Sequence, residues 1–249
     1  MPVPPQLNYD PRSANPLHHF IHGFRFFFSG LPLLFKHPTL LGLSLLPIAF
    51  TLLILFGVAF GAVWLAGSLM ESGLSPLTDQ FRLLGQALVF LIVLLLGFLL
   101  YLPLARVVLA PFSEALSRRA ETIFVGKATK AVFGWKRAMI EGAKLVALQL
   151  IVTVIVLMFS IFVPVVGTPI GIVIAVFFCG LDYLDVPLSV RGLSLGKKLA
   201  VMWRNKSLAL GFGAAGYLLL FIPLVNLFSL PVGVIGATRL VGTLDDPEN

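Results

Sequence analysis

Four long stretches of this chain contain no Asp, Glu, Lys or Arg, and they constrain its fold more than any other feature. They lie between Lys36 and Glu71, between Arg82 and Arg106, and over residues 145–181 and 207–238. An ionised side chain at the centre of a bilayer costs about 2.5–3.5 kcal/mol, and a helix of about 20 apolar residues crosses the hydrocarbon core. The runs therefore predict an integral membrane protein whose membrane segments are α-helical.

The composition excludes an ordinary soluble domain. Of the 249 residues, 58% are hydrophobic and 12% are charged, whereas soluble domains carry about 25% charged residues. The net charge of +7 is typical of a membrane protein with cytoplasmic loops rich in Lys and Arg, so we expect no nucleic-acid partner. The single cysteine, Cys179, excludes an internal disulfide.

The first two runs predict full transmembrane helices over residues 40–70 and 83–105. Residues 17–36, which precede them, mix Phe and Leu with His, Arg and Lys. That mixture is typical of a helix lying at the level of the lipid headgroups. Residues 1–16 are expected to form a disordered tail.

The other two runs, within 145–181 and 207–242, are interrupted by similar proline-containing sequences, Phe162–Gly171 and Phe221–Gly233. Proline removes a backbone donor and clashes with the preceding helical turn. Each run is therefore predicted to form two helices of about 12–19 residues joined by a tight turn.

Each proline-broken run is either one kinked span or a V-shaped re-entrant hairpin whose arms enter and leave on the same face. Segment 106–144 carries eight basic and three acidic residues, and segment 182–206 carries five basic and two acidic residues. Kinked spans would put the two segments on opposite sides of the membrane, against the tendency of basic loops to remain cytoplasmic. The charges therefore favour hairpins, whose turns must be buried in protein or line water.

We therefore expect an all-α integral membrane protein with two long transmembrane helices, two proline-broken re-entrant hairpins, and interfacial and cytoplasmic amphipathic helices. Residues 1–249 are interpreted as one membrane domain, in which 106–144 is a cytoplasmic helical region, 182–206 a basic cytoplasmic segment and 243–249 a tail. Hairpins leave irregular faces that lipid alone covers poorly, so we expect a homo-oligomer. The predicted location is the inner (plasma) membrane, with the N-terminus cytoplasmic.

Ionisable residues at the ends of the apolar runs are candidates for function. Asp182 and Asp185 end the third run about one helical turn apart, Arg106 ends the second run, and Arg239 follows the fourth. Such groups can mark a permeation route, or they can pair and extend toward the interface at helix ends. We interpret the aspartates as partners of Arg106, Arg191 or Arg239.

Other chemistry has little support in the sequence. His18 and His22 are four residues apart and would share a helix face, as metal ligands do, but no third ligand lies nearby. We expect a structural role for them, and no metal or cofactor. No nucleophile motif or Gly-rich phosphate loop is present, so we expect no catalytic residues and no enzyme activity.

Several short motifs resemble a known family. They are Ala110–Phe112, Tyr183–Pro187, Leu210–Ala214 and above all Ile222–Phe228, followed by Pro231 and Gly236–Thr238. These sequences resemble the CysZ sulfate permeases and the broader etoposide-induced protein family over residues 38–241. The resemblance implies two long transmembrane helices and two V-shaped, hemi-penetrating hairpins assembled into dimers or larger oligomers.

The resemblance also implies an anion site. In CysZ proteins the first long helix opens with a Gly-Ile/Leu-Arg-Arg segment that binds sulfate. Aligned on Pro47, this chain has at that place Thr39, Leu40, Leu41 and Gly42, so both arginines are absent. A helix N-terminus still offers N–H groups and a partial positive charge, and Lys36 lies just before it. These five residues are the expected anion-binding site.

The expected function is a passive or proton-assisted permease for sulfate or another small inorganic anion. The alternative is a non-catalytic membrane-organising or biogenesis protein of the same family, and the missing arginines favour it. The expected partners are the anion, the lipid bilayer and further copies of the chain.

Overall fold

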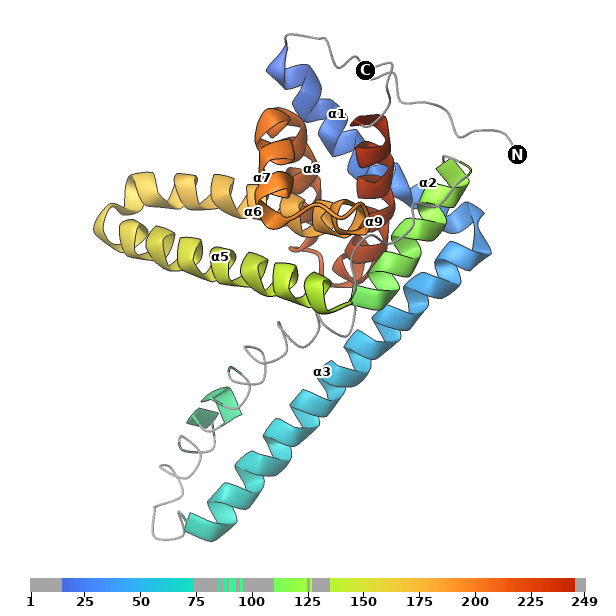
Figure 1. The fold of residues 1–249 in the computed structure, drawn as a ribbon. Helices are drawn as coiled ribbons and strands as arrows, with labels where there is room; N and C mark the ends of the chain where they lie inside the picture. The colour runs from blue at the N-terminus through green and yellow to red at the C-terminus, as the bar shows by residue number, and fades with distance from the viewer. Residues whose placement is uncertain are drawn as a thin grey trace. The chain divides into compact units, whose positions relative to one another are not determined.

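The computed structural model describes residues 15–73, 110–124, 126 and 135–244, with seven further positions between 85 and 95. Every regular element in these residues is an α-helix, so the predicted all-α class is confirmed for them. The named helices are α1 (Pro16–Phe28), α2 (Gly30–Lys36), α3 (Pro38–Gly73), α5 (Trp135–Phe162), α6 (Pro164–Val190), α7 (Leu195–Arg204), α8 (Lys206–Leu219) and α9 (Pro223–Leu244) (Figure 1). Residues 110–124 are also helical.

Among the described residues, three helical segments are long and apolar enough to cross a membrane: Pro38–Leu65, Ile140–Phe162 and Pro164–Val190. Their lengths of 28, 23 and 27 residues exceed the roughly 20 residues that a bilayer requires. The prediction of a membrane protein is therefore supported. The second expected span, 83–105, and Arg106 lie outside the continuously described parts of the chain.

The chain divides into two compact units. One contains Met1–Ser44 and Pro111–Asn249, and the other contains Leu45–Ala110. The core and the polar contacts described below belong to the first unit. The interpretation of residues 1–249 as one integrated domain stays a prediction.

Helices α5 and α6 form an antiparallel hairpin, lying side by side in Figure 1. A single residue, Val163, separates them. A methyl group on Gly167 would lie 2.5 Å from Cα of Ser160, and one on Gly171 would lie 3.1 Å from Val156. These pairs are equidistant from the turn, so the chain reverses at Val163, and a single kinked helix does not fit. How the arms lie in the bilayer stays a prediction.

The arms of this hairpin are longer than the 12–19 residues expected, at 28 and 27 residues. The helices continue beyond the charge-free run into 135–144 and 182–190, because charged side chains are compatible with a helix wherever they find partners or water. The predicted arm length is therefore wrong for this hairpin, and both arms are long enough to cross a bilayer.

The helix breaks occur at the first proline of each repeated motif. Pro164 and Pro223 are the first residues of α6 and α9, a position where the missing N–H group costs nothing. Pro169 and Pro231, in contrast, lie inside these two helices. Their inclusion in the breaks was wrong, because both helices continue through these prolines. Pro231 is buried, whereas Pro169 is exposed.

Helix α8 is central to the first unit and packs on α1, α6 and α9. Among the eight named helices, its contact with α1 is the most extensive. A methyl group on Gly23 of α1 would overlap the carbonyl oxygen of Leu208, and one on Gly211 of α8 would overlap the carbonyl oxygen of Phe20. The two backbones therefore touch, and glycine is the residue that permits this approach.

Aromatic side chains fill the space beside this crossing. Phe26, Phe27 and Phe212 are fully buried, and Tyr183 is almost so. The Phe27 ring centroid lies 5.2 Å from those of both Tyr183 and Phe212, a spacing typical of favourable edge-to-face pairs. The segment 17–36 is divided by Ser29 into α1 and α2. It buries Phe26 and Phe27 in protein but leaves Leu17, Ile21 and Phe35 exposed, and its place at the headgroup level stays a prediction.

Candidate functional site

The N-terminus of α3 is the place where the sequence predicts anion binding. His37 has an extended backbone (φ −117°, ψ 103°) between α2 and α3. Its carbonyl oxygen accepts hydrogen bonds from the amides of Leu40 (2.9 Å) and Leu41 (3.1 Å). Pro38 has no N–H group, so Thr39 supplies the backbone donor of this turn that is left for an anion.

The five predicted residues differ in exposure. Lys36, Thr39 and Gly42 are exposed, and the space where a Gly42 side chain would lie is open. Leu40 is fully buried and anchors the start of the helix in the hydrophobic core. The exposed ammonium of Lys36 and the partial positive charge of the helix end make this turn electropositive.

A buried ion pair joins α6 to α7. Lys198 is 1% exposed, and its Nζ atom donates to Oδ1 of Asp185 and to Oγ of Ser189, both at 2.6 Å. Asp185 and Ser189 are four residues apart, so they share the face of α6 that α7 covers. The ion-pair partner of Asp185 is thus a lysine, not one of the three arginines that we expected.

Helix 110–124 joins the same polar region. Arg191 donates to Oε1 of Glu121 at 3.3 Å, and both side chains are largely buried. Ser117 and Thr238 share a buried hydrogen bond of 2.8 Å, which ties the helix to α9. These partners come from distant parts of the sequence, so no local pattern could have identified them.

The start of α7 is held by an acid from another helix. Oε2 of Glu141, on α5, accepts a hydrogen bond from the amide of Leu195 at 2.8 Å, and Oε1 accepts from Lys144 at 2.8 Å. A carboxylate at a helix N-terminus satisfies an otherwise unpaired N–H group and complements the helix dipole. Glu141 therefore fixes where α7 begins.

The remaining predicted charges have separate contacts. Asp182 is exposed and accepts a hydrogen bond from Nε2 of Gln149 at 2.9 Å. The guanidinium carbon of Arg239 lies 5.7 Å from the centre of the Phe124 ring, within the range of a cation–π interaction. Asp182, Asp185 and Arg239 thus contact three different helices, and their role in permeation stays a prediction.

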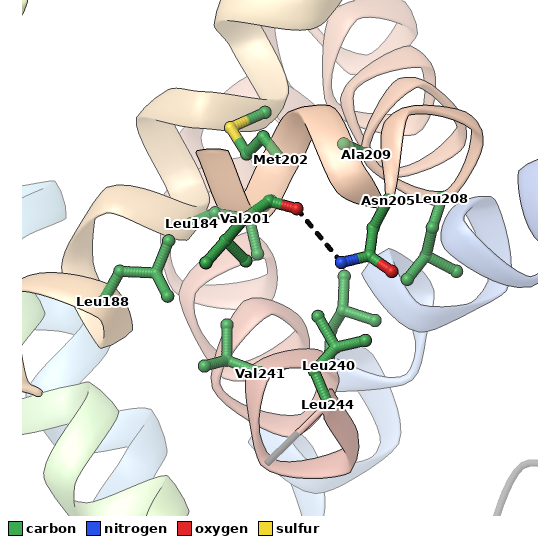
Figure 2. Close-up of a pocket in the computed structure, with 10 residues that line it drawn as sticks. All are labelled: Leu184, Leu188, Val201, Met202, Asn205, Leu208, Ala209, Leu240, Val241 and Leu244. Atoms are coloured by element: carbon green, nitrogen blue, oxygen red, sulfur yellow. Dashed lines mark hydrogen bonds between the residues drawn. The ribbon is translucent and has the colours of Figure 1, made fainter. Parts of the chain in front are cut away.

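A small cavity of about 10 Å³ lies beneath α7 (Figure 2). It is lined by Leu184, Leu188, Val201, Met202, Asn205, Leu208, Ala209, Leu240, Val241 and Leu244. Asn205 is the polar side chain of this lining, and its amide nitrogen donates to the carbonyl oxygen of Val201 at 3.0 Å. The cavity is apolar and about the size of one water molecule, so it does not suit an anion.

The histidine pair predicted on one helix face is present in α1. The ring centroids of His18 and His22 are 4.3 Å apart, and His22 is buried. Within the described part of the chain, no group of three His, Cys, Asp or Glu residues is placed to hold a metal ion. Burial, and then the neighbouring His18 and Arg25, lower the pKa of His22 below its ordinary value of 6.5.

The lowered pKa of His22 predicts loss of stability in acid. The unfolded chain binds more protons than the folded protein between the lowered pKa and 6.5. The contribution of His22 to the free energy of unfolding is therefore fully present above pH 6.5. It falls as the pH drops below that value, by at most about 1.4 kcal/mol per pH unit. In detergent, His22→Gln should show a smaller acid-induced fall in melting temperature than wild type. His37→Gln should show the wild-type fall, and identical falls in all three proteins would contradict this role.

Apolar helices that can cross a bilayer, joined by polar contacts at the helix ends, define an α-helical membrane protein. The chain belongs to the sulfate transporter CysZ/etoposide-induced protein 2.4 family, whose model matches residues 26–231. The resemblance read from the short motifs is thereby confirmed.

Several relatives share most of their length with this chain. It is 30% identical over 209 residues to the sulfate transporter CysZ of Pseudomonas paraeruginosa, covering 80% of this chain and 84% of the relative. It is 27% identical over 210 residues to that of Pseudomonas fluorescens (78% and 82% covered). It is 25% identical over 256 residues to that of Pectobacterium atrosepticum (96% and 91% covered).

Proposed function

We propose that this protein is a permease for sulfate or a related small inorganic anion in the bacterial inner membrane. The observation that carries the proposal is the similarity, along about four fifths of the chain, to proteins named sulfate transporter CysZ. Three helices able to cross a bilayer support the same class of function. No cofactor or catalytic step is required, because a permease moves its substrate unchanged.

The anion is recognised at the start of α3, by the Thr39 amide, the helix dipole and the Lys36 ammonium. Lys36 is the last residue of α2 and precedes α3. A hydrogen bond to an ionised group such as its ammonium contributes about 1.5–3 kcal/mol. With one lysine in place of two arginines, we expect weaker sulfate binding than in relatives that carry both.

The topology that fits this function has both hairpins opening on the cytoplasmic side. The α5–α6 turn at Val163 and the α8–α9 turn at 220–222 then lie within the membrane region. The N-terminus and the basic segments 106–144 and 182–206 lie on the cytoplasmic side. The exposed apolar faces of α5 and α6 contact lipid or further copies of the chain in a homo-oligomer.

Uptake of labelled sulfate into proteoliposomes tests the proposal. Protein-free liposomes are the blank, and chloride and phosphate are the competitors. Sulfate-selective uptake supports the permease. Folded protein that transports none of the three anions would overturn it and favour a membrane-organising role, which the missing arginines already suggest.

Lys36→Gln is expected to reduce sulfate uptake about tenfold or more, the effect of losing one charge-assisted contact. Arg119→Gln, which removes another exposed cation, is the matched control and should transport at the wild-type rate. Unchanged uptake in Lys36→Gln would remove this lysine from the site.

A further inference from the structure

Helix α7 has one face in the protein and one face outside it. Lys198 and Met202 are buried against α6 and the neighbouring helices. On the opposite side, Lys197, Trp203 and Arg204 are exposed and lie within about one third of the helix circumference. Lys206 is also exposed and follows directly at the start of α8. We call these four residues the α7 outer face.

The α7 outer face is strongly basic and has no acid of its own. After Asp185, the next acidic residue in the chain is Asp245, and Asp185 is already paired with Lys198. Within the described residues, Lys197, Arg204 and Lys206 have no ion-pair partner. Three like charges on one exposed face repel one another, so the face favours an anionic partner.

Trp203 indicates which anionic partner this is. Its side chain is 69% exposed, and its indole ring meets the ring of Phe177, on the apolar helix α6, at a centroid distance of 6.4 Å. A free inorganic anion has no apolar surface that could pack against an exposed indole ring. Tryptophan next to Lys and Arg, in contrast, is typical of the level where lipid headgroups meet acyl chains.

We propose that the α7 outer face binds the headgroups of anionic phospholipids. Lys197, Arg204 and Lys206 contact lipid phosphates, and the guanidinium of Arg204 can hold two phosphate oxygens at once. Trp203 inserts its ring between neighbouring headgroups, beside Phe177. The inner face is fixed by the Lys198–Asp185 pair and by Glu141 at the first turn. The outer face is therefore presented rigidly to the membrane surface.

The test uses Trp203 as its own reporter in the full-length protein. Trp64→Phe and Trp135→Phe remove the other two tryptophans of the chain. The protein is placed in nanodiscs of phosphatidylcholine and phosphatidylglycerol, and either lipid carries bromine, which quenches tryptophan. Brominated phosphatidylglycerol should quench Trp203 far more than its mole fraction predicts, whereas brominated phosphatidylcholine should not.

Removing the three charges with K197Q, R204Q and K206Q together should weaken this preference on the order of 100-fold. The control, R25Q with R119Q and R137Q, changes the net charge equally and should keep the preference. Equal quenching by both lipids, or equal loss in the control, would overturn the proposal. Reversal of the quenching by excess inorganic phosphate would also overturn it, since a free-anion site would then explain the face. None of these outcomes depends on sulfate transport.

Discussion

A single methyl group at Gly211 is expected to destabilise this protein strongly, whereas the same group at Gly242 is expected to be harmless. In Gly211→Ala the new carbon would overlap the carbonyl oxygen of Phe20, which is backbone and cannot rotate away. Overpacking usually costs about 1–3 kcal/mol, and an overlap of two helix backbones should reach at least the upper end of that range.

Gly242→Ala is a matched control because its helix position is open, with no atom within 4 Å of the added carbon. Alanine stabilises a helix by about 0.5–1 kcal/mol relative to glycine, and both positions gain this equally. The two variants therefore differ in the contact alone. Size-exclusion profiles and melting temperatures in detergent measure the difference. Equal melting temperatures would show that α1 and α8 do not cross in contact.

The helix breaks at Pro164 and Pro223 could be predicted from the sequence, because they depend on the local chemistry of proline. Pro164 and Pro223 end the preceding helices because a proline constrains its own backbone and the residue before it, whatever the rest of the chain does. Pro169 and Pro231 have the same intrinsic effect, yet α6 and α9 continue through them. Tertiary packing accounts for this at the buried Pro231, and nothing in the structure explains it at the exposed Pro169. The sequence pattern alone contains no information on which prolines other helices cover.

Long-range pairing could not be predicted in the same way. The apolar face of α1 is evident from its spacing, yet lipid and protein are equally apolar, so the pattern does not say which one covers Phe26 and Phe27. Asp185 was a candidate from its place at the end of an apolar run. Its partner Lys198 lies on a helix that folds back on α6, and only the tertiary structure brings it there.

The candidate anion site also combines features that the sequence predicts with features that only the structure shows. The start of a helix near Pro38 follows from proline at a first position, and Lys36 was identified from its place before it. The hydrogen bonds that the Leu40 and Leu41 amides donate to the carbonyl oxygen of His37 were not predictable. They depend on the backbone angles of His37, which lies between two helices.

Lys198→Met is expected to destabilise the protein by about 3–5 kcal/mol, the cost of leaving one member of a buried ion pair alone. Asp185 would lose its cationic partner and one hydrogen bond among largely buried atoms. Lys197→Met, the adjacent exposed lysine, should change the stability by less than about 0.5 kcal/mol. Melting temperatures in detergent distinguish the two variants, and a similar small shift in both would show that the pair is not formed.

The double variant Lys198→Met with Asp185→Leu separates structural support from permeation. Replacing both members with apolar residues removes the unpaired charge, so its destabilisation should be much smaller than the sum of the single changes. If Asp185 acts only by holding α7 against α6, the folded double variant should transport sulfate at about the wild-type rate. Loss of transport in a folded double variant would instead place the Lys198–Asp185 pair on the permeation route, because the change would then remove a charge that the anion or an accompanying proton requires.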